Sequence, residues 1–153
     1  MKTHADLMNK IDADIDRVGW SAIGVMPTTD QPYGMPFIYS IGFYNYSNHP
    51  EMIIVGLDPN VGHTMLHTLF ERVRSGERFE DGQRVSEVLD GYEVEFRAMP
   101  PAGRPLNAAR SYFELEELPA LQVMWPDAEG LFPGEPGFSE QFLGRQDLDE
   151  DDL

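Results

Sequence analysis

The sequence predicts an α+β fold: an antiparallel curved sheet, or a small barrel, of five to six strands with an N-terminal helix and a second packing helix. Three observations predict it. Residues 3–19 and residues 60–76 both carry apolar side chains at helical spacing. Between them lie three apolar, strand-like runs, 20–27, 36–44 and 51–57. The stretches that separate these runs are rich in turn residues and too short for crossover helices, so the strands should be antiparallel.

The N-terminal segment has the features of a complete helix. Thr3 and Asp6 have the spacing of a capping box, and Gly19 stands where a helix C-terminal cap is common. Apolar side chains recur every three or four residues, at Leu7, Ile11, Ile15 and Val18. The opposite face carries Asp6, Asp12, Asp14 and Asp16, so we expect that face to contact solvent.

The second and third apolar runs differ in what they predict. In "PFIYSIGFY", Phe37, Tyr39, Ile41 and Phe43 should share one face of a strand. Ser40 and Gly42 on the other face leave room for a ligand to approach the backbone. The run "EMIIVGL" is apolar on both faces and therefore predicts a central strand.

The second half of the chain predicts further elements after the second helix. Residues 77–91 fit either a strand and a turn or a turn and a helical piece, whereas "YEVEFRAMP" alternates as a strand with one solvated face. A short helix should begin near Pro105, and "ALQVMW" should be a last buried strand. We expect one globular domain over residues 1–137. Residues 138–153 should form an acidic, disordered tail because their like charges repel one another.

Composition excludes several classes of function. The chain has 153 residues, no cysteine and a formal net charge of −16, so disulfides, thiolate catalysis and cysteine metal sites are excluded. The negative field opposes direct binding to DNA or RNA. No apolar run reaches the length of a membrane span, and the N-terminus lacks the apolar centre of a signal peptide, which predicts a soluble cytoplasmic protein. The acidity serves solubility, or it attracts a basic protein partner, in the extreme case as a nucleic-acid mimic.

One helix face carries candidate metal ligands. His63, His67 and Glu71 recur every four residues and should form one stripe on the polar face of the second helix. Such groups can bind zinc or iron, but Thr64 replaces the glutamate that usually follows the first histidine of a helical zinc motif. The stripe is therefore either an ordinary exposed helix face or the centre of a metal-dependent hydrolase.

Two turns carry the other candidate site residues. His49 precedes proline in the turn between two strands, beside Glu51, where it can act as a structural group, a ligand contact or a general base. No nucleophile is identifiable by spacing. After the last strand, Trp125 and Asp127 begin a loop that reaches Phe132, with Gln122 just before it. Asp127 is placed to accept hydrogen bonds from N–H groups around Glu129 and Gly130. The loop either pins a strand exit onto the core or closes an aromatic pocket.

These motifs together resemble one known family. The strand "PFIYSIGF", the turn His49-Pro50-Glu51 and the segment "ALQVMWPDAEGLFP" are similar to members of domain-of-unknown-function family 4262 (DUF4262), over about residues 11–137. The resemblance implies no activity. The order of elements is also similar to that of small flavin-binding split barrels, an analogy of fold alone.

The sequence therefore leaves three functional hypotheses. The first is a small-molecule binding domain, for a flavin-like or other planar cofactor, with a ligand site formed by Tyr39, Ser40, Gly42, His49, Glu51, Gln122, Trp125, Asp127 and Phe132. The second is an acidic protein-interaction or inhibitor protein. The third is the metal-dependent hydrolase with His63, His67 and Glu71 as ligands.

Overall fold

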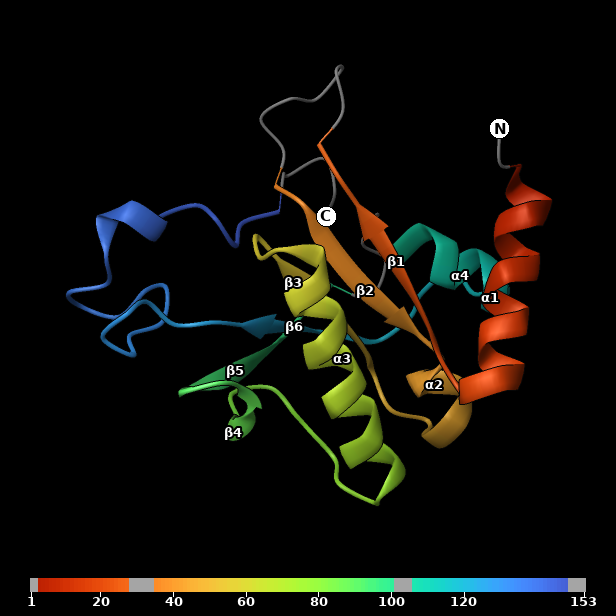
Figure 1. The fold of residues 1–153 in the computed structure, drawn as a ribbon, viewed down its shortest axis with the longest axis horizontal. Helices are drawn as coiled ribbons and strands as arrows, with labels where there is room; N and C mark the ends of the chain where they lie inside the picture. The colour runs from red at the N-terminus through yellow and green to blue at the C-terminus, as the bar shows by residue number, and fades with distance from the viewer. Residues whose placement is uncertain (1–2, 28–34, 101–105, 149–153) are drawn as a thin grey trace.

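The computed structural model describes residues 3–27, 35–100 and 106–148 of the chain (Figure 1). The helices are α1 (His4–Val18), α2 (Phe43–Ser47), α3 (Pro59–Arg74) and α4 (Asn107–Phe113), with a 3₁₀ turn at Glu140–Phe142. The strands are β1 (Ser21–Val25), β2 (Phe37–Ile41), β3 (Glu51–Val55), β4 (Arg84–Leu89), β5 (Tyr92–Ala98) and β6 (Ala120–Met124). The α+β fold class is confirmed.

The strands form one open, mixed sheet in the order β1-β2-β3-β6-β5-β4. β1, β2 and β3 form the expected antiparallel meander, with β3 in the interior of the sheet. β6 lies between β3 and β5 and is parallel to β3, with Glu51 opposite Ala120. The sequence did not predict this parallel pair. It follows from the long connection through α3, β4, β5 and α4, which brings the chain back to β3.

The two faces of the sheet are covered by different helices, and each face has its own core. On the α3 side, Met65, Leu66, Leu69, Phe70 and Val73 pack against alternate strand residues, as the helical spacing predicts. On the other side, α1 and α4 pack over a second core that contains Ile11, Tyr39, Ile41 and Ala109. In Figure 1, α3 crosses in front of the sheet, with α1 and α4 at its right-hand end.

The first helix has the predicted caps. Thr3 Oγ1 accepts a hydrogen bond from Asp6 N at 3.1 Å, and Thr3 N donates to Asp6 Oδ2 at 3.0 Å. Gly19 ends the helix with φ +94°, and its N–H donates to Ile15 O. A residue with positive φ favours glycine because glycine lacks the Cβ that strains this conformation.

The second strand is shorter than its apolar pattern predicts. The expected strand 36–44 ends at Ile41, because Gly42 has φ +134° and the chain turns into α2. Phe43 therefore does not share a face with Tyr39 and Ile41, as its spacing predicted. Its ring lies in the α3-side core, 5.4 Å from the ring of Phe70.

Candidate functional site

Four of the predicted ligand-binding residues lie where β2, α2 and β3 meet, and Glu51 bonds to two of the others, Ser40 and Gly42. We call Ser40, Gly42, His49 and Glu51 the His-Pro-Glu corner. The Glu51 carboxylate is fully buried and accepts hydrogen bonds from Ser40 Oγ at 2.7 Å and Gly42 N at 2.8 Å. It also accepts from Phe43 N at 3.1 Å and Tyr44 N at 3.2 Å. Glu51 thus satisfies the N–H groups that begin α2.

The corner places an ionisable carboxylate in an apolar environment. Burial raises the pKa of Glu51 to about 7, against the lowering effect of its four hydrogen bonds. All four donors come from the chain itself, so both carboxylate oxygens are already occupied. The arrangement holds the corner together.

His49 is also buried and has two backbone partners. Its Nδ1 lies 2.9 Å from Pro50 O, and its Nε2 accepts from Phe79 N at 2.9 Å. These contacts require a neutral ring with the proton on Nδ1. Burial lowers the pKa of His49, and the charge of Arg78 lowers it further, against the raising effect of the Pro50 bond. The imidazole joins the β2–β3 connection to the segment after α3.

The predicted aromatic residues do not meet in one cavity. Tyr39 lies in the α1-side core, whereas Trp125 lies in the α3-side core. His49 contacts the ring of Phe43, also in the α3-side core. The Tyr39 hydroxyl accepts a hydrogen bond from Ala108 N at 3.2 Å, and burial raises its pKa to about 12. The prediction that an imidazole, a phenol and an indole share a pocket is therefore wrong, because strand alternation sends Tyr39 to the opposite face.

The loop after β6 is pinned by Asp127 and Trp125. The Asp127 carboxylate accepts from Leu131 N and Ser139 N at 2.9 Å and from Glu129 N at 3.0 Å. Burial opposes its ionisation, but these bonds hold the pKa of Asp127 below its usual range. The bond from Glu129 was predicted, whereas Gly130 N donates to the backbone oxygen of Asp127. Trp125 Nε1 donates to Val55 O at 2.8 Å.

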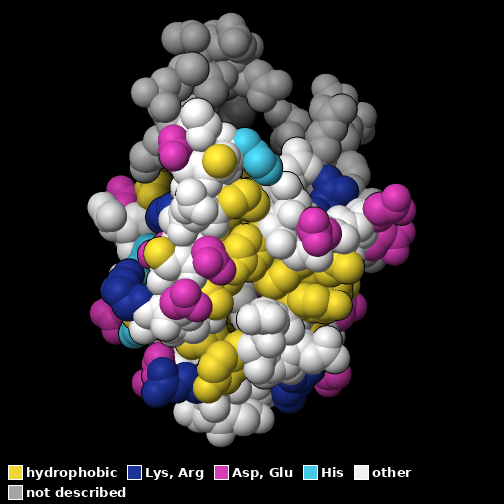
Figure 2. All heavy atoms as spheres, turned by 90° about the vertical axis from the view of Figure 1, so that its right-hand side faces the viewer, with side chains coloured by type: hydrophobic (Ala, Val, Ile, Leu, Met, Phe, Trp, Pro, Cys, Tyr) yellow, Lys and Arg dark blue, Asp and Glu magenta, His cyan; other side chains and the backbone are white. Residues whose placement is uncertain are grey.

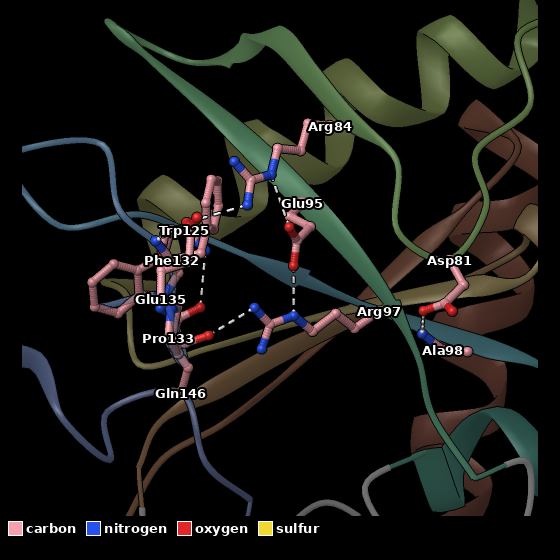
Figure 3. A network of polar contacts seen from close by, with 10 residues as sticks. All are labelled: Asp81, Arg84, Glu95, Arg97, Ala98, Trp125, Phe132, Pro133, Glu135 and Gln146. Atoms are coloured by element: carbon pink, nitrogen blue, oxygen red, sulfur yellow. Dashed lines mark hydrogen bonds and ion pairs between the residues drawn. The ribbon is translucent and has the colours of Figure 1, made fainter. Parts of the chain in front are cut away.

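Phe132 is the second anchor of this loop, and Figure 3 shows the ion-pair network around it. Phe132 is buried, and the Arg84 guanidinium lies 4.5 Å from its ring centroid. Arg84 also pairs with Glu95 at 2.8 Å and with Glu135 at 3.2 Å. Arg97 pairs with Glu95 at 2.6 Å and donates to Pro133 O at 2.9 Å. The β4–β5 hairpin thereby holds the loop, which favours the strand-exit interpretation of the Trp-Pro-Asp segment.

A cleft of about 420 Å³ lies elsewhere, beside the outer edge of β1. β1 is at one end of the strand order, and α1 and α3 flank it from opposite faces of the sheet. We call this site the β1 cleft. It is lined by Lys10, Asp14, Arg17 and Val18 of α1, by Trp20, Ser21 and Ala22, and by His63, His67, Glu71 and Arg74 of α3.

Lys10 has partners on α1 and β1, inside the cleft. Its Nζ lies 3.1 Å from Asp14 Oδ2, 3.1 Å from Ala22 O and 3.4 Å from Ser21 Oγ. These contacts use all three donors of an ammonium group. Ser21 Oγ donates to Asp14 at 2.7 Å. Burial raises the pKa of Asp14, but the bonds to Ser21 and Lys10 lower it more, so the net pKa is below its usual value. Asp14 is therefore a weak base for activating the serine.

The two arginines of the cleft are more available. Arg17 has a side chain that is 72% exposed and lies 3.5 Å from Asp14. Arg74 is 54% exposed and lies 3.6 Å from Glu71. Both pairs are long for charge-assisted hydrogen bonds, which are near 2.8 Å. The guanidinium groups can therefore turn toward a bound anion.

The histidine stripe lies on the wall of this cleft. His63, His67 and Glu71 are exposed on α3, and the His63 ring lies 5.3 Å from the ring of Trp20. Within the described ranges, no group of three or more His, Asp or Glu side chains is placed to hold a metal ion. The metal prediction therefore lacks a formed site. A helix rises about 1.5 Å per residue, so residues eight positions apart stand about 12 Å apart and do not reach one ion.

Sequence reasoning missed most of the cleft. It selected His63, His67 and Glu71 and placed Arg74 on the same stripe, but it did not connect them with Lys10, Arg17 or Trp20. A weak signal was present, since Lys10, Asp14 and Arg17 lie at i, i+4 and i+7 on one face of α1. The sequence does not show that this face of α1 and the polar face of α3 lie on opposite sides of β1 and line the same cleft.

The acidity of the chain does not form one continuous surface on the face that Figure 2 shows. Asp and Glu side chains are scattered there among basic side chains, and apolar side chains gather in the middle. In the part of the chain that the structure describes, no helix has the length and apolar character needed to cross a membrane.

The comparisons with known proteins agree with the motifs. No curated protein and no solved structure is significantly similar to the chain. A family model described as "Domain of unknown function (DUF4262)" matches residues 14–139, which include the His-Pro-Glu corner and the Trp-Pro-Asp loop. The chain belongs to the DUF4262 family.

Proposed function

We propose that this protein binds a small anionic molecule in the β1 cleft. The observation that carries the proposal is the gathering of cations there. The cleft is lined by three of the chain's eleven Lys and Arg residues and two of its four His residues, against only Asp14 and Glu71. Without counting histidine, three cations and two carboxylates leave the lining at +1, in a chain whose formal net charge is −16.

The size and the donors of the cleft support a small ligand. Its volume of about 420 Å³ lies within the range of about 300–1,000 Å³ that is typical of small-molecule sites. Arg17 and Arg74 offer forked donors, which suit a carboxylate or a phosphate because they bind two oxygens at once. Along α3, His67 lies between His63 and Arg74. Lys10 is held by its internal partners and contributes a fixed positive charge.

The aromatic end of the cleft favours a ligand with a flat part. The rings of Trp20 and His63 both line the cleft, with their centroids 5.3 Å apart and their planes tilted by 35°. A planar group can pack on the His63 ring while its anionic group lies toward the arginines. The hypothesis of a planar, flavin-like ligand is therefore kept, but its site is now the β1 cleft instead of the nine residues that the sequence suggested.

Calorimetric titration with three probes tests this proposal. Inorganic phosphate carries only the anion, riboflavin only the planar ring system, and flavin mononucleotide both. We expect flavin mononucleotide to bind most tightly and riboflavin least tightly, because the arginines supply most of the attraction. Loss of one charge-assisted hydrogen bond weakens binding by about tenfold or more, so Arg17→Gln and Arg74→Gln should each have this effect.

Arg145→Gln is the matched control, because it removes the same charge from an exposed arginine whose guanidinium lies against Phe142 rather than in the cleft. It should leave the affinity unchanged. If none of the three probes binds, or if the three arginine variants weaken binding equally, the β1 cleft is not an anion site.

A further inference from the structure

The C-terminal segment returns to the sheet through one buried glutamine. Gln146 is only 4% exposed, and its side-chain amide bonds to the backbone of Trp125 in both directions. Trp125 N donates to Gln146 Oε1 at 2.9 Å, and Gln146 Nε2 donates to Trp125 O at 2.7 Å. Gln122 Nε2 donates to Gln146 O. The glutamine amide thus takes the place of a neighbouring strand just beyond the last β3–β6 pair, Ile53 with Gln122.

The sheet is shaped to accept this segment closely. Gly56 follows β3 with φ +89°, and a Cβ at this position would lie 2.1 Å from Arg145 O. No real Cβ approaches an oxygen so closely, so only glycine lets the segment pass here. Phe142 packs edge-on against Trp125, with ring centroids 5.7 Å apart. We call residues 139–146 the strap.

The strap is attached at few points. It begins where Ser139 N donates to Asp127, and most of its side chains point to solvent, with Leu143 63% exposed. Its buried contacts come from Phe142 and Gln146. The connection before it includes the exposed residues Gly134, Pro136 and Gly137. The family match ends at residue 139, so the accepting residues Gly56, Gln122 and Trp125 lie within it, whereas Phe142 and Gln146 of the strap lie beyond it.

We infer that Gly56, Gln122 and Trp125 form a peptide-binding site for an aromatic residue followed four positions later by glutamine, and that the strap of a second copy of this chain can fill it. In each separate molecule the chain's own strap occupies the site. Exchange between two molecules makes the same contacts, so it costs little beyond the entropy of association. Within one molecule, the strap competes strongly with the strap of a second copy, because it is covalently joined to its own site and therefore has a high effective concentration there.

Two complementary variants test the exchange in the full chain. Gly56→Ala blocks the site but keeps an intact strap, whereas Gln146→Ala keeps the site but has a defective strap. Neither variant should dimerise alone. When they are mixed, one intact site meets one intact strap, and light scattering should detect a species of about twice the 17.3 kDa chain mass. A mixture that stays monomeric while both variants are folded would overturn the inference.

A peptide assay covers the case in which Gly56→Ala does not fold. A labelled peptide of residues 137–148 should bind the Gln146→Ala chain at least tenfold more tightly than it binds the wild-type chain, whose own strap competes. If Gln146→Ala also fails to fold, Phe142→Ala serves as the weakened-strap chain. The control is the same peptide with the Gln146→Ala substitution, which leaves Gln141 in place. Equal binding of the two peptides contradicts the inference.

Discussion

The His-Pro-Glu corner and the β1 cleft use similar residue types in opposite ways. Each has a glutamate, a histidine and a serine, Glu51, His49 and Ser40 in the corner and Glu71, His67 and Ser21 in the cleft. In the corner, Glu51 and His49 are fully buried and every described partner is another part of the chain. In the cleft, the glutamate and the histidine are exposed on α3.

The difference teaches how to interpret an unusual motif. The corner stands out in the sequence because a buried carboxylate needs several donors at fixed positions, and these come from Ser40, Gly42 and the residues after it. The need for donors at fixed positions around a buried carboxylate restricts the neighbouring residues as much as the need to bind a ligand does. The cleft has an ordinary sequence because its residues need only be brought together where α1 and α3 pack on opposite sides of β1.

The largest expected effect separates the two glutamates. Glu51→Gln should destabilise the protein by about 2–6 kcal/mol, because its amide NH₂ points at two of the four N–H or O–H donors around Glu51, and each buried donor left unsatisfied costs about 1–3 kcal/mol. Glu71→Gln should change stability by less than about 1 kcal/mol, because its ion pair with Arg74 is exposed. Urea unfolding of both variants at pH 8 measures this difference. Equal stability losses would mean that the corner does not depend on its carboxylate.

The fold was predictable where local patterns are strong. The capping box, the α3 stripe and the alternation of residues 92–98 predicted elements that the structure contains. The parallel β3–β6 pair was not predictable from local patterns, because it depends on where the chain returns after four further elements. The end of β2 at Ile41 was missed because its cause, Glu51 bonding to the start of α2, lies ten residues further along the chain.

The candidate site was less predictable than the fold. Tyr39, His49 and Trp125 are conspicuous in the sequence, but strand alternation and the order of strands distribute them over two faces of the sheet. The strap was also missed, since residues 138–153 were expected to form a disordered tail. In the structure, Gln146 is buried and Leu148 packs on the α1-side core, while residues 149–153 lie outside the described residues.

The next effect in size compares two buried serines. Ser40 Oγ donates to Glu51 and accepts from Met52 N at 2.9 Å, so Ser40→Ala leaves an N–H group and part of a carboxylate unsatisfied in the core. We expect a loss of about 1–3 kcal/mol. Ser21→Ala should cost less than about 1 kcal/mol, because Asp14 keeps Lys10 and Arg17 at the edge of the open cleft. Thermal unfolding of both variants gives the ranking, and a larger loss for Ser21→Ala would reverse our comparison.

The smallest expected effect is a change of stability with pH near neutrality, which arises from Glu51 and His49 of the His-Pro-Glu corner. The pKa of Glu51 rises from an unfolded value of 4.5 to about 7 in the folded protein. Its stabilising contribution is therefore complete below pH 4.5 and is lost as the pH rises through 7. His49 has a lowered pKa and acts in the opposite direction, because its contribution is present above its unfolded value of 6.5 and is lost as the pH falls.

Between pH 6.5 and 8 the Glu51 contribution to the free energy of unfolding should fall by about 1 kcal/mol, and the His49 contribution, which rises by up to about 0.4 kcal/mol in the same window, offsets part of that fall. Carbon-13 NMR of the side-chain carboxyl groups measures the same event directly, because the Glu51 signal should titrate near pH 7. A Glu51 midpoint near 4.5 would mean that its four donors fully compensate burial. The corner would then be electrostatically no different from the cleft, and only its packing would distinguish them.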